Sequence, residues 1–143
     1  MAAEKLYTPQ VLGLATALAR WPWDADLPLR ASARSRSCGS GLELGLALDE
    51  AGRVERLGLK AQACAIGQAA AAIFADAAAG RSLQEIAASG SALADWLAGE
   101  GAMPDWPGLV ALVAAREVPG RHGAILLAWN AARSLLPTTG SDG

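Results

Sequence analysis

The sequence predicts an α+β protein, with helices packed on one face of a small antiparallel sheet of about three strands. Two observations carry this prediction. Leucine alternates strictly with other residues over residues 42–48, which is the pattern of a half-buried strand. From Cys64 onward, apolar residues recur at helical spacing instead. Strands that come first and helices that follow are typical of this class.

The chain of 143 residues suits one domain with its own core. We expect residues 1–137 to form this domain and residues 138–143 to form a flexible tail. The formal net charge of −2 gives no electrostatic reason to expect binding to nucleic acid or to an anionic membrane. We see no secretory signal, and the alanine-rich run 63–80 is too weakly apolar to span a bilayer. We therefore expect a cytoplasmic protein.

The first predicted element is a helix. Thr8 is a candidate N-cap, Pro9 would occupy the first helical position, and apolar residues follow at helical spacing over residues 11–21. Residues 22–30 carry two prolines that break regular structure, so this segment is expected to be a loop.

The strands follow this loop. Residues 31–37 predict a short edge strand, and residues 42–48 predict the central strand. Residues 49–52 read as a hairpin turn whose last residue, glycine, is free to take a positive φ. The returning strand has one apolar face over residues 57–61, and Val54 is out of phase with it, which predicts a β-bulge.

Helical patterns fill the rest of the chain from Cys64. Ser82 and Glu85 form a predicted capping box, and Ser91 is a candidate N-cap for a separate short helix. Residues 109–118 fit either a helix or a buried extended segment. The predicted helices cover residues 65–80, 82–90, 91–101 and 119–136.

The five tryptophans fall into two groups. Trp96 and Trp129 lie within helical patterns and are expected in the core. Trp21, Trp23 and Trp106 flank prolines and are expected to be partly exposed.

The two cysteines are expected at the same open end of the hairpin. Cys38 precedes the central strand, and Cys64 lies where the returning strand gives way to a helix. The positive end of a helix and nearby cations, here Arg34 and Arg36, favour thiolate over thiol, the form that binds metal or attacks sulfur. We therefore predict a shared functional site, with two small buried side chains as the alternative.

The order of motifs over residues 37–86 resembles the iron–sulfur cluster scaffold family of the NifU N-terminal, IscU and SufU type. The matching features are Cys-Gly, an alternating strand, an Asp…Gly turn, a second strand, and a cysteine before a helix of small residues. The segment "PGRHGAILLAWNAA" is similar to the last helix of SufU-type members. The resemblance implies an IscU/SufU-like fold.

The ligand positions of the family are only partly kept. Ser40 stands where the resemblance implies an aspartate, and Ala124 stands where it implies a third cysteine. We expect both residues at the rim of the site. The chain's only histidine, His122, is one position away from the family's histidine. The resemblance thus implies Cys38 and Cys64 as ligands, with His122 as a further candidate, for an iron–sulfur cluster or Zn that is bound weakly or transiently.

Three functions are compatible with this resemblance. The first is a scaffold-like protein that carries or transfers iron, sulfur or a nascent cluster through Cys38 and Cys64. The second is a degenerate adaptor of the same fold that binds no metal, and the third is a sulfur acceptor for a cysteine desulfurase. The implied partners are a cysteine desulfurase, other iron–sulfur assembly proteins and a second copy of the chain. With one histidine and no Ser-His-Asp arrangement, we expect no enzymatic site.

Overall fold

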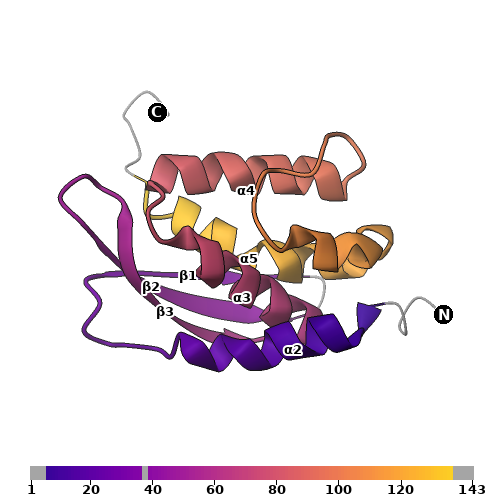
Figure 1. Cartoon of the computed structure of the whole chain (residues 1–143), viewed down its shortest axis with the longest axis horizontal. Coiled ribbons are helices and arrows are strands. Elements are labelled where there is room, and N and C mark those ends of the chain that lie inside the picture. The colour runs from indigo at the N-terminus through magenta and orange to yellow at the C-terminus, as the bar shows by residue number, and fades with distance from the viewer. Residues whose placement is uncertain (1–5, 37–38, 137–143) are drawn as a thin grey trace.

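The computed structural model describes residues 6–36 and 39–136. It has the predicted α+β architecture, with a three-stranded antiparallel sheet in the order β1-β2-β3 and helices gathered on one of its faces (Figure 1). The strands are β1 (Leu29–Arg34), β2 (Gly41–Leu48) and β3 (Val54–Gln62). The α-helices are α2 (Pro9–Ala17), α3 (Ala65–Ala78), α4 (Leu83–Leu97) and α5 (His122–Arg133), with short 3-10 helices at Leu18–Arg20, Leu109–Glu117 and Pro119–Arg121.

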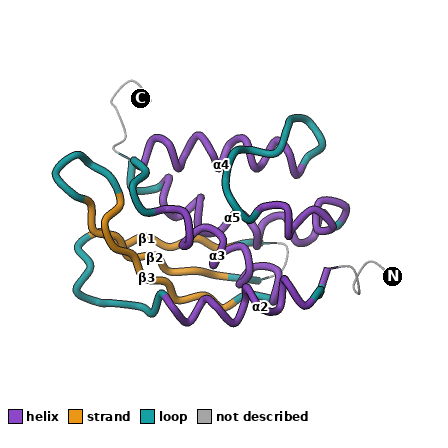
Figure 2. Tube along the Cα trace, in the orientation of Figure 1, coloured by secondary structure: helices purple, strands orange, loops and turns teal. Residues whose placement is uncertain are grey.

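The strands and the helices occupy separate layers (Figure 2). The three strands lie together, and α3 and α5 lie on one side of them with α4 farther out (Figure 2). None of the described helices is long and apolar enough to cross a membrane. The predicted domain, residues 1–137, and its tail, residues 138–143, stay predictions, because the tail lies outside the described residues.

Helix α2 begins as predicted. The hydroxyl oxygen of Thr8 accepts a hydrogen bond from the amide of Val11 at 3.1 Å, and Pro9 opens the helix. Since the side chain of Thr8 satisfies an amide that the helix itself leaves unpaired, the cap fixes where the helix starts.

The β2–β3 hairpin contains the predicted bulge. Ala47 pairs with Arg56 and Leu48 pairs with Val54, so Glu55 is an extra residue in β3. Gly52 in the turn has a φ of 80°, as expected. The edge strand begins two residues earlier than predicted and ends three residues earlier, because the chain turns back beyond Arg34.

The outer face of the sheet, away from the helices, is more covered than the alternating pattern predicted. The loop before β1 folds over the part of it that contains Gly45 and Gly58, and Leu27 is only 2% exposed. A Cβ added to Gly45 would lie 3.0 Å from Leu27 Cδ1, and one added to Gly58 would lie 2.4 Å from the carbonyl oxygen of Pro22. These two glycines let the loop approach the strands closely.

Helix α4 corrects a predicted break. A separate helix starting at Ser91 was expected, but α4 continues through this position. Gly90 packs against Trp129 of α5, where a Cβ would lie 3.0 Å from Trp129 Cβ, so the glycine permits a close approach between helices. Ser91 is no cap; its hydroxyl accepts a hydrogen bond from Arg133.

An aromatic cluster forms the centre of the core. Phe74, Trp106 and Trp129 have ring centroids 5.2–5.6 Å apart. Trp106 was expected to be partly exposed, but it is only 3% exposed, and its indole nitrogen donates to the carbonyl of Ile73 at 3.0 Å. Trp96 and Trp129 are buried as predicted, at 5% and 1% exposure.

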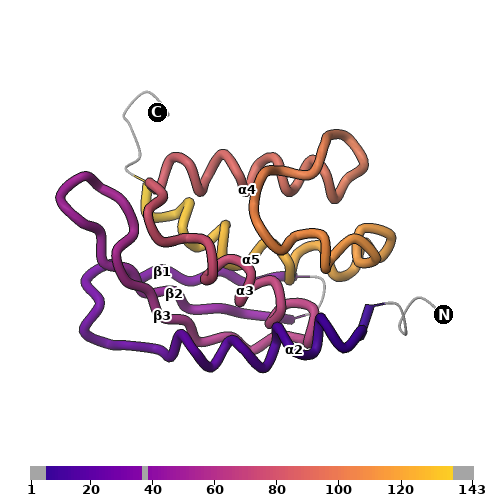
Figure 3. The backbone as a smooth tube through the Cα atoms, viewed as in Figure 1, coloured from indigo at the N-terminus to yellow at the C-terminus, as the bar shows by residue number. Residues whose placement is uncertain are grey.

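The sequence of residues 109–118 fitted either a helix or a buried extended segment, and the structure shows a helix. Residues Leu109–Glu117 form a 3-10 helix, preceded by Gly108 with a φ of 94°. Helix α5 then returns to the sheet and lies beside α3 and α4, as the path of the chain shows (Figure 3).

Candidate functional site

The predicted site lies at one end of the sheet, where β2 begins and β3 ends. Gly41 and Gln62 are the last paired residues of this ladder. Ser40 precedes Gly41 in the chain, and Cys64 follows Gln62 by two residues. The start of α3 and the connection from β1 to β2 therefore meet at the same end of the sheet (Figure 3).

Cys64 occupies the N-cap position of α3. Its backbone is extended, with φ −64° and ψ 169°, and its side chain makes no capping hydrogen bond. The thiol is free and the residue is half-buried. The carbonyl of Cys64 accepts from the amide of Gln68 at 2.9 Å, and the side chain of Gln68 donates to the carbonyl of Ala63 at 3.0 Å. The first turn of α3 thus has no side-chain cap, and the positive end of its dipole lies at Cys64.

Cys38 lies outside the described residues, so its distance from Cys64 stays a prediction. Two backbone hydrogen bonds join the described residues on either side of Cys38. The amide of Ser35 donates to the carbonyl of Ser40 at 2.8 Å, and the amide of Gly39 donates to the carbonyl of Ser35 at 3.1 Å. Arg34, one of the cations expected to favour a thiolate, is exposed at the end of β1, next to Ser35.

The two positions where the family has other ligands are both buried. Ser40 is 4% exposed and Ala124 is 1% exposed. A Cβ added to Gly67, in the first turn of α3, would lie 3.2 Å from the Cβ of Ala124. The start of α5 therefore packs against the first turn of α3, three residues after Cys64. The expectation that both positions lie at a rim is wrong, because both side chains are buried, and for Ala124 the contact with the first turn of α3 accounts for the burial.

His122 begins α5 and faces a different part of the molecule. Its Nε2 lies 3.0 Å from the carbonyl oxygen of Arg116. It lines a cavity between α4 and the 3-10 helix Leu109–Glu117, and Cys64 is not among the residues that line this cavity. The neighbouring Arg121 has a buried Nε without a hydrogen-bond partner among the described residues.

The ligand set of the described chain is small. Within residues 6–36 and 39–136, no three His, Cys, Asp or Glu side chains lie close enough together to hold a metal ion. Structural Zn sites take four protein ligands, and iron–sulfur clusters are held by several thiolates. Among the described residues, Cys64 is the one cysteine at this end of the sheet.

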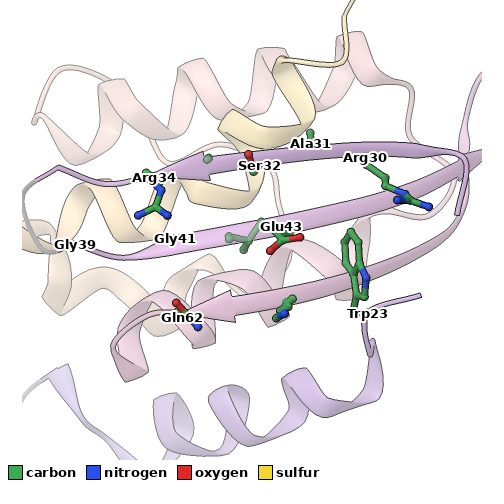
Figure 4. A pocket seen from close by; sticks show the side chains of 12 residues that line it. Trp23, Arg30, Ala31, Ser32, Arg34, Gly39, Gly41, Glu43 and Gln62 are labelled. Atoms are coloured by element: carbon green, nitrogen blue, oxygen red, sulfur yellow. The ribbon is translucent and has the colours of Figure 1, made fainter. Parts of the chain in front are cut away.

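The structure also has a polar pocket that was not predicted from the sequence. The outer face of the sheet has a shallow pocket of about 470 Å³, to which Arg34, Glu43, Lys60 and Gln62 contribute (Figure 4). The signal was present, because these residues fall on the polar positions of the alternating strands.

Solved structures share this fold. A NifU-like protein (N-terminal) from Brucella abortus superposes with a TM-score of 0.83 at 24% sequence identity, covering 94% of each chain. A putative iron–sulfur cluster assembly scaffold protein for the SUF system, from Fervidobacterium islandicum AW-1, superposes with a TM-score of 0.78 at 16% identity, covering 90% of this chain and 95% of the other. A third structure, of a hypothetical protein, has a TM-score of 0.64 at 21% identity, over 87% of this chain and 94% of that chain.

These similarities confirm the fold implied by the sequence resemblance: the chain has the architecture of NifU-like and SufU proteins. No model of a protein family matches the sequence, and no curated protein is significantly similar to it. Because these identities are below 25%, the structural similarity establishes the fold and does not by itself establish the function.

Proposed function

We propose that the chain is a scaffold-like protein of iron–sulfur cluster assembly, which carries or transfers iron, sulfur or a nascent cluster through Cys38 and Cys64. The observation that supports this most is the placement of Cys64. Its free, half-buried thiol lies at the uncapped start of α3, at the end of the sheet where β1 connects to β2. Solved structures of the same fold are described as NifU-like and as a SUF scaffold.

The cargo would be held by an incomplete set of ligands. Two thiolates from one chain leave a four-ligand site half filled. The remaining ligands would come from a second copy of the chain, from a partner protein or from a small thiol. Such a site releases its cargo readily, because each missing protein ligand weakens the binding, and this suits transfer better than storage.

A cysteine desulfurase is the partner that this function requires for its sulfur. The thiol of Cys64 packs against the edge of the core, but it is only half-buried and forms no disulfide among the described residues, so a partner's sulfur donor can reach it. In this version of the proposal, Cys64 acts as a sulfur acceptor, and other assembly proteins receive the sulfur or the cluster.

A second candidate, the degenerate adaptor, is supported by the buried positions. Ala124 is enclosed by the first turn of α3, and Ser40 is 4% exposed. Neither side chain supplies the thiolate or carboxylate that the family would place there. In this reading, the fold is kept as a surface for protein partners.

The test is analysis of anaerobically purified protein for iron, zinc and labile sulfide, with the mass of the complex measured alongside. The scaffold function predicts a metal or cluster that is lost in Cys64→Ser and in Cys38→Ser. Incubation with a cysteine desulfurase and cysteine, followed by mass spectrometry, tests for sulfur bound to either cysteine.

The matched control is Ser134→Ala. It alters a residue near the end of the last helix, whose hydroxyl donates to the carbonyl of Ala131. It should retain whatever the wild type binds. A folded wild type with neither metal nor acquired sulfur would contradict the scaffold and acceptor functions and leave the adaptor.

A further inference from the structure

The outer face of the sheet has an open half next to its covered half. The loop before β1 covers Gly45 and Gly58, whereas a Cβ at Gly41 would meet, among the described residues, only Ala33 and Arg34 of β1 within 4 Å. There the pocket of about 470 Å³ lies on the side away from the helices (Figure 4). This volume falls within the usual range for small-molecule sites, roughly 300–1,000 Å³.

Gly41 makes the floor of this pocket. It pairs with Arg34 of β1 on one side and with Gln62 of β3 on the other, so the three residues form a row across the sheet. A Cβ added to Gly41 would lie 3.8 Å from Arg34 Cγ and 3.8 Å from the carbonyl oxygen of Ala33. The missing side chain therefore leaves a hollow beside the stem of Arg34, bordered by the amide of Gln62.

The charges around the hollow are unbalanced. Arg30, Arg34 and Lys60 line the pocket with one carboxylate, Glu43. Among the described residues, neither Arg34 nor Lys60 makes a hydrogen bond or an ion pair, while Arg30 donates to the carbonyl of Ala25. Arg34 thus flanks the glycine of the central strand without a hydrogen bond to another described residue, and Lys60 lies directly opposite Glu43, one position further along the same face.

We propose that this pocket binds a molecule with a single carboxylate head. The guanidinium of Arg34 offers two parallel N–H donors that match a carboxylate, and the amide of Gln62 offers another. Lys60, diagonal to Gly41 on β3, adds a second positive charge. The proposal rests on this face alone and is independent of the cysteine site.

The rest of the pocket restricts the body of the ligand. Glu43 lies next to the hollow and repels a second anionic group, so the body is neutral and offers an N–H or O–H donor to this carboxylate. Trp23 forms the far wall and provides an apolar surface (Figure 4). A free N-acylated amino acid and the C-terminal residue of a peptide both have this chemistry: one carboxylate, one amide N–H and one apolar side chain.

The test is a titration of the folded full chain followed by amide chemical shifts. The probes are N-acetylphenylalanine, its C-terminal amide, and an N-acetylated hexapeptide without charged side chains that ends in phenylalanine with a free carboxylate. We expect saturable shifts at Gly41, Glu43 and Lys60 with both acids and none with the amide. Tighter binding of the hexapeptide would identify a peptide C-terminus as the source of the carboxylate, and equal or weaker binding would identify a free small acid.

Two variants make the test specific. Arg34→Gln should weaken binding of the acid by about tenfold or more, since it removes a charge-assisted pair. Gly41→Ala should abolish binding while the fold is kept, because the added Cβ meets only ordinary contacts and fills the hollow. The matched control is Arg36→Gln, an exposed arginine two residues away that does not line the pocket.

Several results would overturn the proposal. They are an absence of shifts with the acids, equal binding of the acid and its amide, and an equal loss in Arg34→Gln and Arg36→Gln. The last result would indicate a general effect of charge. Unchanged binding in a folded Gly41→Ala variant would likewise exclude the hollow as the site of the carboxylate.

Discussion

Gly58 of β3 lies under the loop that crosses the outer face, and the backbone of this loop sets a limit on its side chain. An added Cβ would lie 2.4 Å from the carbonyl oxygen of Pro22 and 3.2 Å from the amide nitrogen of Asp24. Backbone atoms have less freedom to move aside than the end of a flexible side chain. We predict that Gly58→Ala lowers the free energy of unfolding by about 1–3 kcal/mol, the usual range for overpacking.

Gly13→Ala is the matched control for this variant. Gly13 lies inside α2, and an added Cβ would meet nothing within 4 Å. Alanine is the better helix former, so this change should raise the free energy of unfolding by roughly 0.5–1 kcal/mol. Urea denaturation of the three proteins measures both effects. Equal stability of Gly58→Ala and the wild type would mean that the loop does not press on β3.

Ser40 and Ala124 allow a direct test of the site at the residue scale. The double variant Ser40→Asp and Ala124→Cys introduces the two ligands that the resemblance to the scaffold family implies at these positions. We predict a steep rise in Zn affinity, because three thiolates and a carboxylate from one chain complete a four-coordinate site. Competition with a chromogenic chelator measures it. The single variants are the controls, and each should gain less than the pair.

Both positions are buried, so some loss of stability is expected in this double variant. Thermal unfolding with and without Zn separates the two effects, since bound metal stabilises the folded state by mass action. A folded variant that takes up no more Zn than the wild type would refute the alignment at Ala124.

Among the elements, the start of α4 is stabilised by hydrogen bonds within its own first turn and by an ion pair with the β2–β3 hairpin. The hydroxyl of Ser82 accepts from the amide of Glu85 at 3.1 Å, and the carboxylate of Glu85 accepts from the amide of Ser82 at 2.8 Å. Arg53, in the turn between β2 and β3, lies 3.0 Å from the same carboxylate. The capping box was predicted from sequence and is confirmed, whereas the ion pair joins residues 32 positions apart and had no local signal.

This arrangement predicts a pH dependence of stability. The backbone hydrogen bond from Ser82, followed by the charge of Arg53, lowers the pKa of Glu85 below its ordinary value. A lowered pKa in the folded state means that the ionised group stabilises the fold above its unfolded pKa. This stabilisation begins to decrease as the pH falls below about 4.3, the ordinary pKa of a glutamate. It is lost once the pH has fallen through the lower pKa that Glu85 has in the folded state.

The variant Glu85→Gln should therefore be less stable than the wild type near neutral pH, and the difference should shrink on acidification. Urea denaturation across this pH range measures it. The control is Glu50→Gln, which alters an exposed glutamate that makes no hydrogen bond or ion pair among the described residues. A constant difference between Glu85→Gln and the wild type at every pH would contradict the assignment.

What could be predicted at this scale depended on whether nearby residues decide the structure. Thr8, the hairpin glycine and the capping box act within four residues, and their elements begin or turn as expected. Gly90–Ser91 has the local look of a boundary, yet α4 continues there because Trp129, from another helix, packs against the glycine. The 3-10 helix Leu109–Glu117 has a pattern that fits two structures, so sequence alone did not decide it.

For the whole molecule, the core connects distant segments through Trp106. Its ring stacks on Phe74, and its indole nitrogen donates to a carbonyl of α3. We predict that Trp106→Ala costs about 3–5 kcal/mol, the usual range for removing a buried tryptophan. That is a large part of the roughly 5–15 kcal/mol that holds a domain folded. Thermal and urea unfolding measure it.

Trp23→Ala is the control, since Trp23 is half-buried on the outer face of the sheet and lies outside the core. It should cost clearly less. Equal losses for the two tryptophans would contradict a core centred on Phe74, Trp106 and Trp129. The flanking prolines of Trp106 suggested exposure because they mark a turn, but the partner of its indole lies 33 residues away.

The placement of the site at this scale was partly predictable. The order of strand, turn, strand and helix was enough to place Cys64 at the open end of the hairpin, because antiparallel strands return to where they started. The enclosure of Ala124 was not predictable, because it depends on how α5 crosses the first turn of α3. The loop over Gly45 and Gly58 was also missed, since glycine in a strand has several explanations.

The sheet has unequal edges, and this limits how two copies could share a cluster. On β3, the backbone of Trp21 already accepts a hydrogen bond from Leu59, so the loop closes part of that edge. On β1, no described strand pairs along the side away from β2. Consider two chains that pair antiparallel through their β1 edges about a two-fold axis. The open ends of their hairpins, where Cys64 lies, would then point in opposite directions. Since a strand of six residues spans roughly 20 Å, the two Cys64 thiols would be too far apart to bind one cluster. A cluster held between two copies would therefore need a different contact from this pairing of β1 edges, one that brings the starts of the two α3 helices together.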